Sequence, residues 1–348
     1  MKHGLLQPPT KNYIWILLLR QRIRYWHVSN LKFAPGVYQA IDCGTASIRT
    51  LAIEVTENGD YTTVHNSSVE HDIGRNLTEL QALAPETIET LITSTQQFMG
   101  IAKELGAKSI VAAATESLRS AANGAEVLER LAAEAMPFQM LSGLDELQTS
   151  LMGVLPHLRQ FKGPFYFADS GGGSTELGIV NADDFSVVAG DSLQIGVAPW
   201  SHRFEAIGEI IDVEHLDDAV DEMTAQFAEA MDGWPTLEEG ATLAVAGAPM
   251  NLFRYVREIV GSTYDIEDRT MHRAEVEKAA QEIAAMRLAA REAHPYIDSK
   301  GVGFLLPCAL KILALMNVTN TDKIYVLHSG ICVGLCLQSA KIELNKAV

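Results

Sequence analysis

Two short segments of the sequence carry acidic, glycine and hydroxyl residues at the same spacing. Residues 42–47 read DCGTAS and residues 169–174 read DSGGGS, so each segment has Asp first, Gly third and Ser sixth. Glycines in a tight turn expose backbone N–H groups and let phosphate oxygens approach closely, and nearby hydroxyls add hydrogen-bond donors. We therefore predict two phosphate-binding loops, made of Gly44, Thr45, Ser47, Gly171, Gly172, Gly173, Ser174 and Thr175.

The residues around each loop exclude the commonest nucleotide-binding designs. An apolar run, VYQAI before Asp42 and PFYFA before Asp169, precedes each loop, and a second run, SIRTLAIEV or TELGIV, follows it. These runs predict a strand on each side of the loop, which makes a hairpin. A Walker loop and a dinucleotide fingerprint both lead into a helix, and the Walker loop ends in Lys. One such hairpin could be an ordinary tight turn, but the repeated pattern favours a shared function.

The rest of the chain alternates strand and helix patterns, which indicates an α/β fold. A helix is expected at 85–105, because Pro85 starts the run and Gly106 follows it. Further helices are expected at 125–136, 144–155, 213–231, 272–292, 303–316 and from 330, and further strands at 61–69, 109–115, 138–142, 241–247 and 323–327. The second loop restarts the pattern of the first. We therefore predict a domain at 37–163 and a domain at 164–348 whose last helix packs back on the first, after an extension at 1–36 that is disordered or reflects a misplaced start site.

Composition limits the partners. The first forty residues hold six Lys or Arg and no acid, and the remainder holds 21 basic and 44 acidic residues. Such an acidic body binds nucleic acid poorly, so an anionic substrate needs local donors. The apolar run Tyr13–Leu19 is far shorter than the roughly 20 residues of a membrane span, so no membrane partner is expected.

The spacing of the four cysteines does not match a zinc site and is typical of free thiols, which predicts a cytoplasmic protein; they are Cys43, Cys308, Cys332 and Cys336.

Four segments together resemble the exopolyphosphatase and guanosine pentaphosphate phosphatase family of the actin-like superfamily. They are DCGTASIR at 42–49, ATESLRSAANG at 114–124, LSGLDELQTSLMGV at 141–154 and DSGGGSTEL at 169–177. The resemblance covers about Val37 to Gln338. It implies two actin-like, ribonuclease H-like domains, each a mixed sheet flanked by helices, with an active-site cleft between them. It also implies a divalent metal, Mg²⁺ or Mn²⁺.

The same resemblance implies roles for five residues. Glu146 matches the catalytic base, which would orient and deprotonate a water; an exposed acid at a helix start is the alternative. Glu176 matches a second active-site glutamate, and Arg119 matches an arginine that contacts phosphate unless it forms a surface salt bridge. Asp169 ends a buried strand, where an unpaired carboxylate is costly, so metal ligation is expected there and at Asp42. A turn-capping Asp is the alternative at both positions.

Several positions depart from the family pattern. Ala46 replaces Asn, Pro199 replaces Arg, His202 replaces Glu, Ala248 and Pro249 replace Gly and Thr, Cys332 and Val333 replace Arg and Glu, and 299–307 lacks an Arg-Ala-Asp motif. With these changes, the sequence shows few of the basic residues that would line a binding track for a long polyphosphate. They put the strength of catalysis in doubt.

The leading hypothesis is an enzyme that releases the terminal phosphate of polyphosphate by in-line attack of water. Three alternatives stay open: a guanosine pentaphosphate phosphatase, a sugar or acid kinase of the same superfamily, and a non-catalytic binder of polyphosphate or an alarmone. The sequence leaves a homodimer open.

Overall fold

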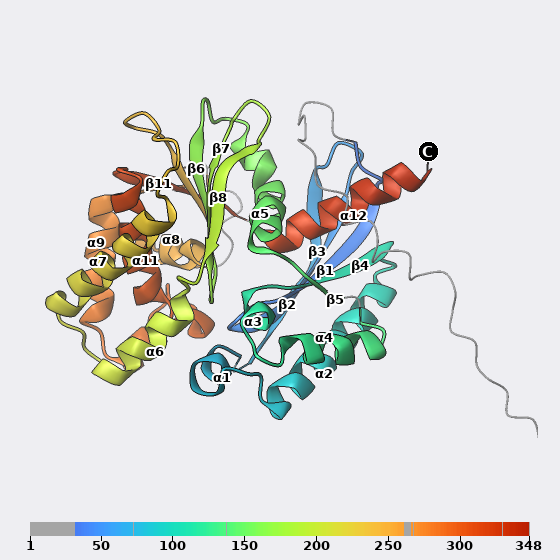
Figure 1. Ribbon diagram of the computed structural model, residues 1–348, viewed down its shortest axis with the longest axis horizontal. Helices are drawn as coiled ribbons and strands as arrows, with labels where there is room; N and C mark the ends of the chain where they lie inside the picture. Colours follow the sequence, from blue (N-terminus) through green and yellow to red (C-terminus); the bar gives the residue numbers. More distant parts are fainter. Residues whose placement is uncertain are drawn as a thin grey trace, which may run out of the picture.

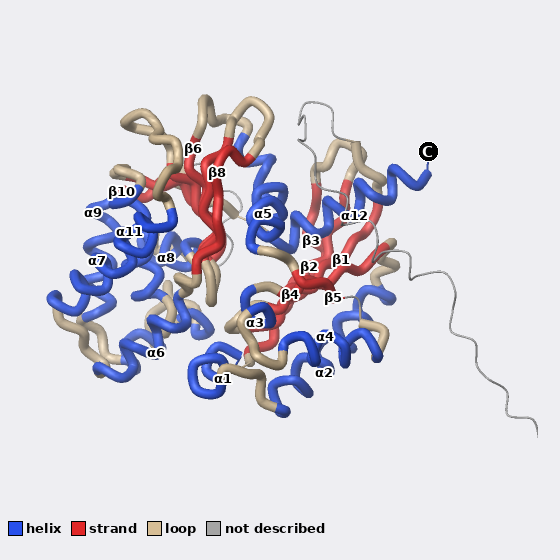
Figure 2. Tube along the Cα trace, viewed as in Figure 1, coloured by secondary structure: helices blue, strands red, loops and turns tan. Residues whose placement is uncertain are grey.

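The computed structural model describes residues 32–71, 73–136, 138–260, 266, 268–328 and 330–347. The apolar run at 13–19 lies outside them. Two mixed sheets with helices packed around each make up the molecule (Figures 1 and 2), as expected for the fold class.

The first sheet has the strand order β3-β2-β1-β4-β5. Its strands are β1 (Gly36–Cys43), β2 (Ser47–Val55), β3 (Tyr61–Glu70), β4 (Ser109–Ala114) and β5 (Phe138–Met140). The three first strands are antiparallel, whereas β4 and β5 join parallel to β1. Helices cover both faces around β1, which explains its nearly continuous burial.

The second sheet repeats this plan with the order β10-β11-β9-β6-β7-β8. Its strands are β6 (Phe165–Ser170), β7 (Thr175–Val180), β8 (Val187–Leu193), β9 (Leu243–Gly247), β10 (Thr270–His272) and β11 (Lys323–Val326). Again an antiparallel meander, β6 to β8, is extended by a parallel strand, β9, beside its first member. The two loops therefore occupy equivalent places, β1–β2 and β6–β7.

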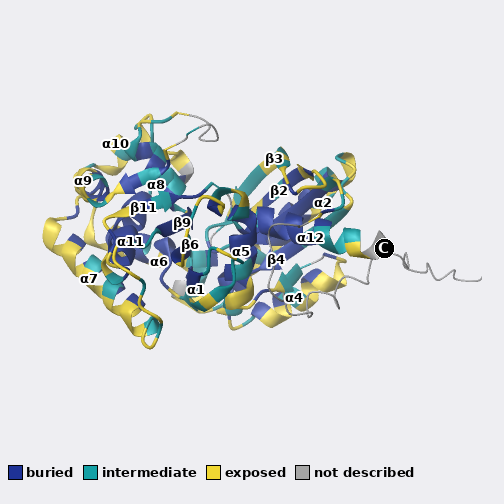
Figure 3. Cartoon of the chain, turned by 90° about the horizontal axis from the view of Figure 1, so that it is seen from above, coloured by how far each residue is buried: buried dark blue, intermediate teal, exposed yellow. Residues whose placement is uncertain are grey.

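Helices pack on each sheet according to their apolar faces. Around the first sheet lie α1 (Ile73–Leu80), α2 (Pro85–Glu104), α3 (Glu116–Arg119), α4 (Gly124–Ala133) and α12 (Ile331–Ala347), and α5 (Gly143–Leu158) lies between α12 and the second sheet. Around the second lie α6 (Val197–Ile207), α7 (Val213–Ala230), α8 (Pro249–Val256), α9 (Arg273–Ala284), α10 (Leu288–Glu292) and α11 (Leu305–Val318). Buried residues gather where α12 and α5 meet the sheets (Figure 3).

Within the described residues, no helix combines the length and the apolar character that a membrane span requires.

One expected helix, 272–292, is wrong as a single element. It ends at Ala284, and Arg287 is extended before α10 begins. The apolar face of α9 stops there, because none of the residues of α10 is buried. The carbonyls freed at the break find other donors: Ile211 N–H donates to Ala284 O at 3.1 Å and Arg291 Nε to Met286 O at 3.0 Å.

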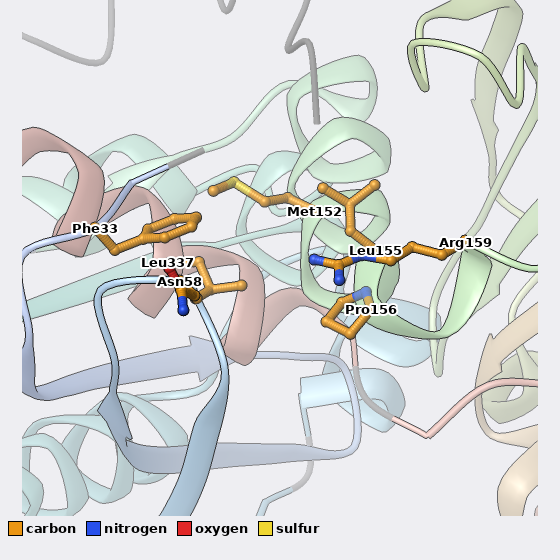
Figure 4. Close-up of a pocket in the computed structure, with 8 residues that line it drawn as sticks. Phe33, Asn58, Met152, Leu155, Pro156, Arg159 and Leu337 are labelled. Carbon is orange, nitrogen blue, oxygen red and sulfur yellow. The ribbon is translucent and has the colours of Figure 1, made fainter. Parts of the chain in front are cut away.

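The final helix returns to the first sheet and crosses α5 at backbone distance. A Cβ on Gly153 would collide with Gly330 O, and one on Gly334 would collide with Thr149 O. Beside the crossing lies a cavity of about 30 Å³, where Phe33 faces residues of α5 and α12 (Figure 4). Because α5 also packs on the second sheet through Leu147, this crossing ties both sheets together.

Replacing Gly334 by Ala should destabilise the protein by about 3 kcal/mol, because the added methyl group meets backbone that cannot rotate away. Urea unfolding measures the loss. The matched control is Gly100→Ala on α2, where a Cβ meets nothing within 4 Å, and this variant should gain roughly 0.5–1 kcal/mol. Equal effects of the two substitutions would contradict the close crossing.

Candidate active site

The first loop is a tight hairpin tip whose carbonyls are held from one side. Gly44 N–H donates to Ser47 O at 3.1 Å. The carbonyl of Thr45 accepts the N–H of Gly74 at 3.0 Å, and that of Ala46 accepts the N–H of His71 at 3.3 Å. The start of α1 therefore fixes this loop.

The second loop has the same tip, with Gly171 N–H donating to Ser174 O at 3.0 Å. Its carbonyls point into the second domain, where Gly171 O accepts Val197 N–H at 3.3 Å and Gly172 O accepts Ala198 N–H at 2.8 Å. Among the described residues, the N–H groups of Gly172 and Gly173 have no protein acceptor. Such a row of amides suits an anion.

The two loops meet each other. A Cβ on Gly172 would lie 3.6 Å from Ala46 N, and one on Gly173 would overlap the Thr45 hydroxyl. A Cβ on Gly196 would collide with the backbone of Gly172 and Gly173. Glycine is required at 196 because backbone meets backbone there, and a side chain at 173 would have to displace Thr45, whereas the contact at 172 is an ordinary van der Waals distance. The structure thus brings the two predicted phosphate loops together.

The predicted hydroxyl donors do not all face this contact. Ser174 Oγ donates to Glu176 Oε1 at 2.7 Å, and Thr175 Oγ1 donates to Ile195 O at 2.6 Å, both inside the second domain. Their contact with phosphate stays a prediction, and the geometry favours Thr45 over these two.

Glu146 lies on the first turn of α5, which Ser142 caps through a bond from Asp145 N–H. Its carboxylate is buried, 8% exposed, and accepts Arg119 Nη1 at 2.8 Å. Burial and the nearby charge of Glu176 raise the pKa of Glu146 well above 4.5, although Arg119 opposes the shift. A carboxylate with a raised pKa accepts a proton more readily than an ordinary carboxylate.

Arg119 is shared between two acids, one of which was missed from the sequence. Its Nη2 donates to Glu116 Oε2 at 3.0 Å, and Nη1 also donates to Leu141 O at 2.8 Å. Glu116 Oε1 accepts Gln194 Nε2 from the second domain at 2.8 Å. Glu116 lies in the same TESLR segment as Arg119, three residues earlier, and that helical spacing was the available signal.

Glu176 lies opposite Asp169 in the β6–β7 ladder and is 1% exposed. Besides Ser174, its Oε1 accepts Ser192 Oγ at 2.7 Å. Burial, with a contribution from Asp169, raises the pKa of Glu176 from 4.5 to about 7. The charge of Glu176 contributes to the raised pKa of Glu146, since both carboxyls lie in a poorly solvated space.

The two aspartates predicted to bind metal already have protein partners. Asp42 Oδ2 accepts Arg49 Nη2 at 2.8 Å, and Asp169 Oδ2 accepts Ser150 Oγ. Burial raises the pKa of Asp169, against the charge of Arg49 and the bond from Ser150. Among the described residues, no group of three or more His, Cys, Asp or Glu side chains is arranged to hold a metal.

The fold is that of solved exopolyphosphatases. The exopolyphosphatase of Cytophaga hutchinsonii aligns with a TM-score of 0.73 and 16% identity over 88% of this chain and 98% of its own. A Ppx/GppA family protein of Aquifex aeolicus gives a TM-score of 0.70 and 17% identity over 88% and 98%.

Residues 52–342 match the Ppx/GppA phosphatase family, and the chain belongs to that family. Exopolyphosphatase 2 of Mycobacterium tuberculosis, strains CDC 1551 / Oshkosh and H37Rv, is 29% identical over 174 residues. That match covers 47% of this chain and 53% of the relative. The chain thus spans about half the length of the curated relatives it matches. The predicted family and the predicted fold class are both confirmed.

The raised pKa of Glu176 makes stability depend on pH. Below pH 4.5 the carboxyl is neutral in both folded and unfolded chains, and between 4.5 and about 7 only the folded chain keeps the proton. Folding stability therefore falls as pH rises through this window. Glu176→Gln, which stays neutral and keeps its oxygen acceptor, should gain about 3 kcal/mol over wild type on going from pH 4.5 to pH 7.5.

Urea unfolding at the two pH values tests this expectation. Glu129→Gln, at an exposed position of α4, is the control and should track wild type at both. A constant difference between Glu176→Gln and wild type would show that the carboxyl is not buried in its neutral form.

Proposed function

We propose that the protein hydrolyses phosphoanhydride bonds and releases the terminal phosphate of inorganic polyphosphate. One observation carries the proposal: a buried Glu146 with a raised pKa is bonded to Arg119, and the two glycine loops touch, with free amides on the second of them. A base, a cation and anion-binding amides are what phosphoryl transfer to water requires.

Each group has a distinct task in the proposed reaction. The free amides of Gly172 and Gly173 bind oxygens of the substrate. Arg119, whose two Nη atoms hold Glu146 and Glu116, brings a positive charge near the terminal phosphoryl group, where negative charge is spread over the oxygens. Glu146 takes one proton from the attacking water as the water oxygen bonds to phosphorus. The bridging P–O bond then breaks, which leaves a phosphate and a chain shorter by one unit.

The proposal includes a magnesium or manganese ion, which Asp42 and Asp169 would hold. Asp42 and Asp169 each use one carboxylate oxygen on a protein partner and keep the other. Mg²⁺ is usually held by one or two carboxylates together with substrate phosphates and water, so the lack of a larger protein cluster agrees with such a site. When bound, the ion would neutralise charge on the phosphate oxygens.

The relatives named above favour polyphosphate over guanosine pentaphosphate, since the matched proteins of Mycobacterium tuberculosis and Cytophaga hutchinsonii both carry the name exopolyphosphatase. Within the proposal the guanosine nucleotide is the second candidate substrate. A panel of tripolyphosphate, longer polyphosphate and guanosine pentaphosphate, each with Mg²⁺ and with Mn²⁺, distinguishes them by released phosphate.

Glu146→Gln should lower kcat at least about 100-fold with little change in KM, because it keeps the bond to Arg119 but cannot accept the proton. Asp145→Asn is the matched control: it removes an exposed acid from the same helical turn and should keep near wild-type activity. A chelator should stop release in wild type, and added Mg²⁺ should restore it.

Two results would remove the proposal. One is full activity in Glu146→Gln. The other is the absence of phosphate release from every compound of the panel with either metal. Calorimetric binding without turnover would instead support the non-catalytic alternative.

A further inference from the structure

A lysine lies at the centre of α11, the most apolar of the helices that the structure describes. Helix α11 reads LLPCALKILALMNV, and its residues 305–316 are all buried. Lys311 within this run is 0% exposed. Its Nζ donates to Gly171 O and to Ile195 O, both at 3.1 Å. Among the described residues, it forms no ion pair with a carboxylate.

The two carbonyls do not need the lysine to be satisfied. Gly171 O also accepts the N–H of Val197, and Ile195 O also accepts the hydroxyl of Thr175 at 2.6 Å. A buried ammonium, in contrast, loses its hydration, which is costly. An apolar side chain at 311 would therefore serve the core better, so packing does not explain the residue.

The position of the ammonium points to the second loop. The carbonyl of Gly171 and the N–H of Gly172 belong to one peptide group, and that N–H is free for an anion. A cation bonded to the oxygen of a peptide group polarises the group and strengthens its N–H as a donor. Because the C=O and N–H of a trans peptide point in opposite directions, Lys311 acts on this group from the side opposite its free N–H.

The charges around the second loop also support a role for Lys311 there. Glu176 and Asp169 make the surroundings of the loop acidic, and the charge of each acts on Lys311. Pro199 and Cys332 are uncharged, so these side chains supply no cation. Lys311 brings a positive charge to the loop from within the core.

We propose that Lys311 is a positioning residue that polarises the second phosphate loop from beneath and sets its affinity for phosphate groups. The proposal rests on the function proposed above and adds a determinant of affinity that does not touch the substrate.

The test compares binding with stability. Tripolyphosphate with Mg²⁺ is titrated calorimetrically into Glu146→Gln protein, which limits turnover, with and without Lys311→Met. The Met variant should bind about 10-fold more weakly and yet melt at a higher temperature, because it removes the desolvated charge. A residue that only held the structure would lower both. Lys323→Met, at an exposed position of β11, removes one charge from the same domain and should change neither.

The pH profile gives a second readout. Burial lowers the pKa of Lys311 from 10.5 to about 8, against the charges of Cys308, Glu176 and Asp169. Affinity should therefore fall above pH 8 more steeply with lysine present than in Lys311→Met. Lys311→Gln can still donate to a carbonyl but is neutral, so it should resemble the Met variant and serves if that one does not fold.

Three outcomes separate the claims. Equal affinity for tripolyphosphate with Lys, Met and Gln, in a protein that binds and hydrolyses it, overturns this inference alone. If each Lys311 variant that binds tripolyphosphate more weakly also melts at a lower temperature, this inference is overturned as well. If wild type neither binds nor hydrolyses any compound of the panel, the proposed function fails and takes the inference with it.

Discussion

Burial of negative charge is the constraint on which the rest of the structure depends. Glu146, Glu176 and Asp169 lie where water has little access, and burial raises the pKa of each. Three cations oppose that cost from different directions: Arg119 from α3, Arg49 from β2 and Lys311 from α11. Each cation comes from a different element, so the two sheets and their helices must be in register for the acids to be tolerated.

Glycine residues allow the segments that surround these acids to come into close contact. Loops 42–47 and 171–174 approach until backbone touches side chain, and α5 and α12 approach until backbone touches backbone. Both contacts join segments that are far apart in the sequence, and both lie between the two sheets. Side chains larger than hydrogen at Gly173 or Gly334 would separate the parts that carry the acids and the amides.

The features that were predicted from the sequence are those that a local residue pattern encodes. The repeated loops, the Ser142-capped helix with Glu146 and most strands follow from glycine spacing, caps and alternating apolar runs. The break between α9 and α10 was missed, because the end of an apolar face depends on where the core stops. Glu116 and Lys311 were missed as well, since their partners Gln194 and Gly171 are distant in sequence. For Lys311, the available signal was a single lysine inside the mostly apolar run LLPCALKILALMNV.

The contact between Thr45 and Gly173 has a mechanical consequence. With the hydroxyl of one loop seated on the bare Cα of the other, no phosphorus atom fits between them at that point. A phosphate group could therefore reach the free amides of Gly172 and Gly173 only from outside this contact. The glycines of the α5–α12 crossing leave equally little room, so both contacts between the two sheets limit the size of the side chains around them.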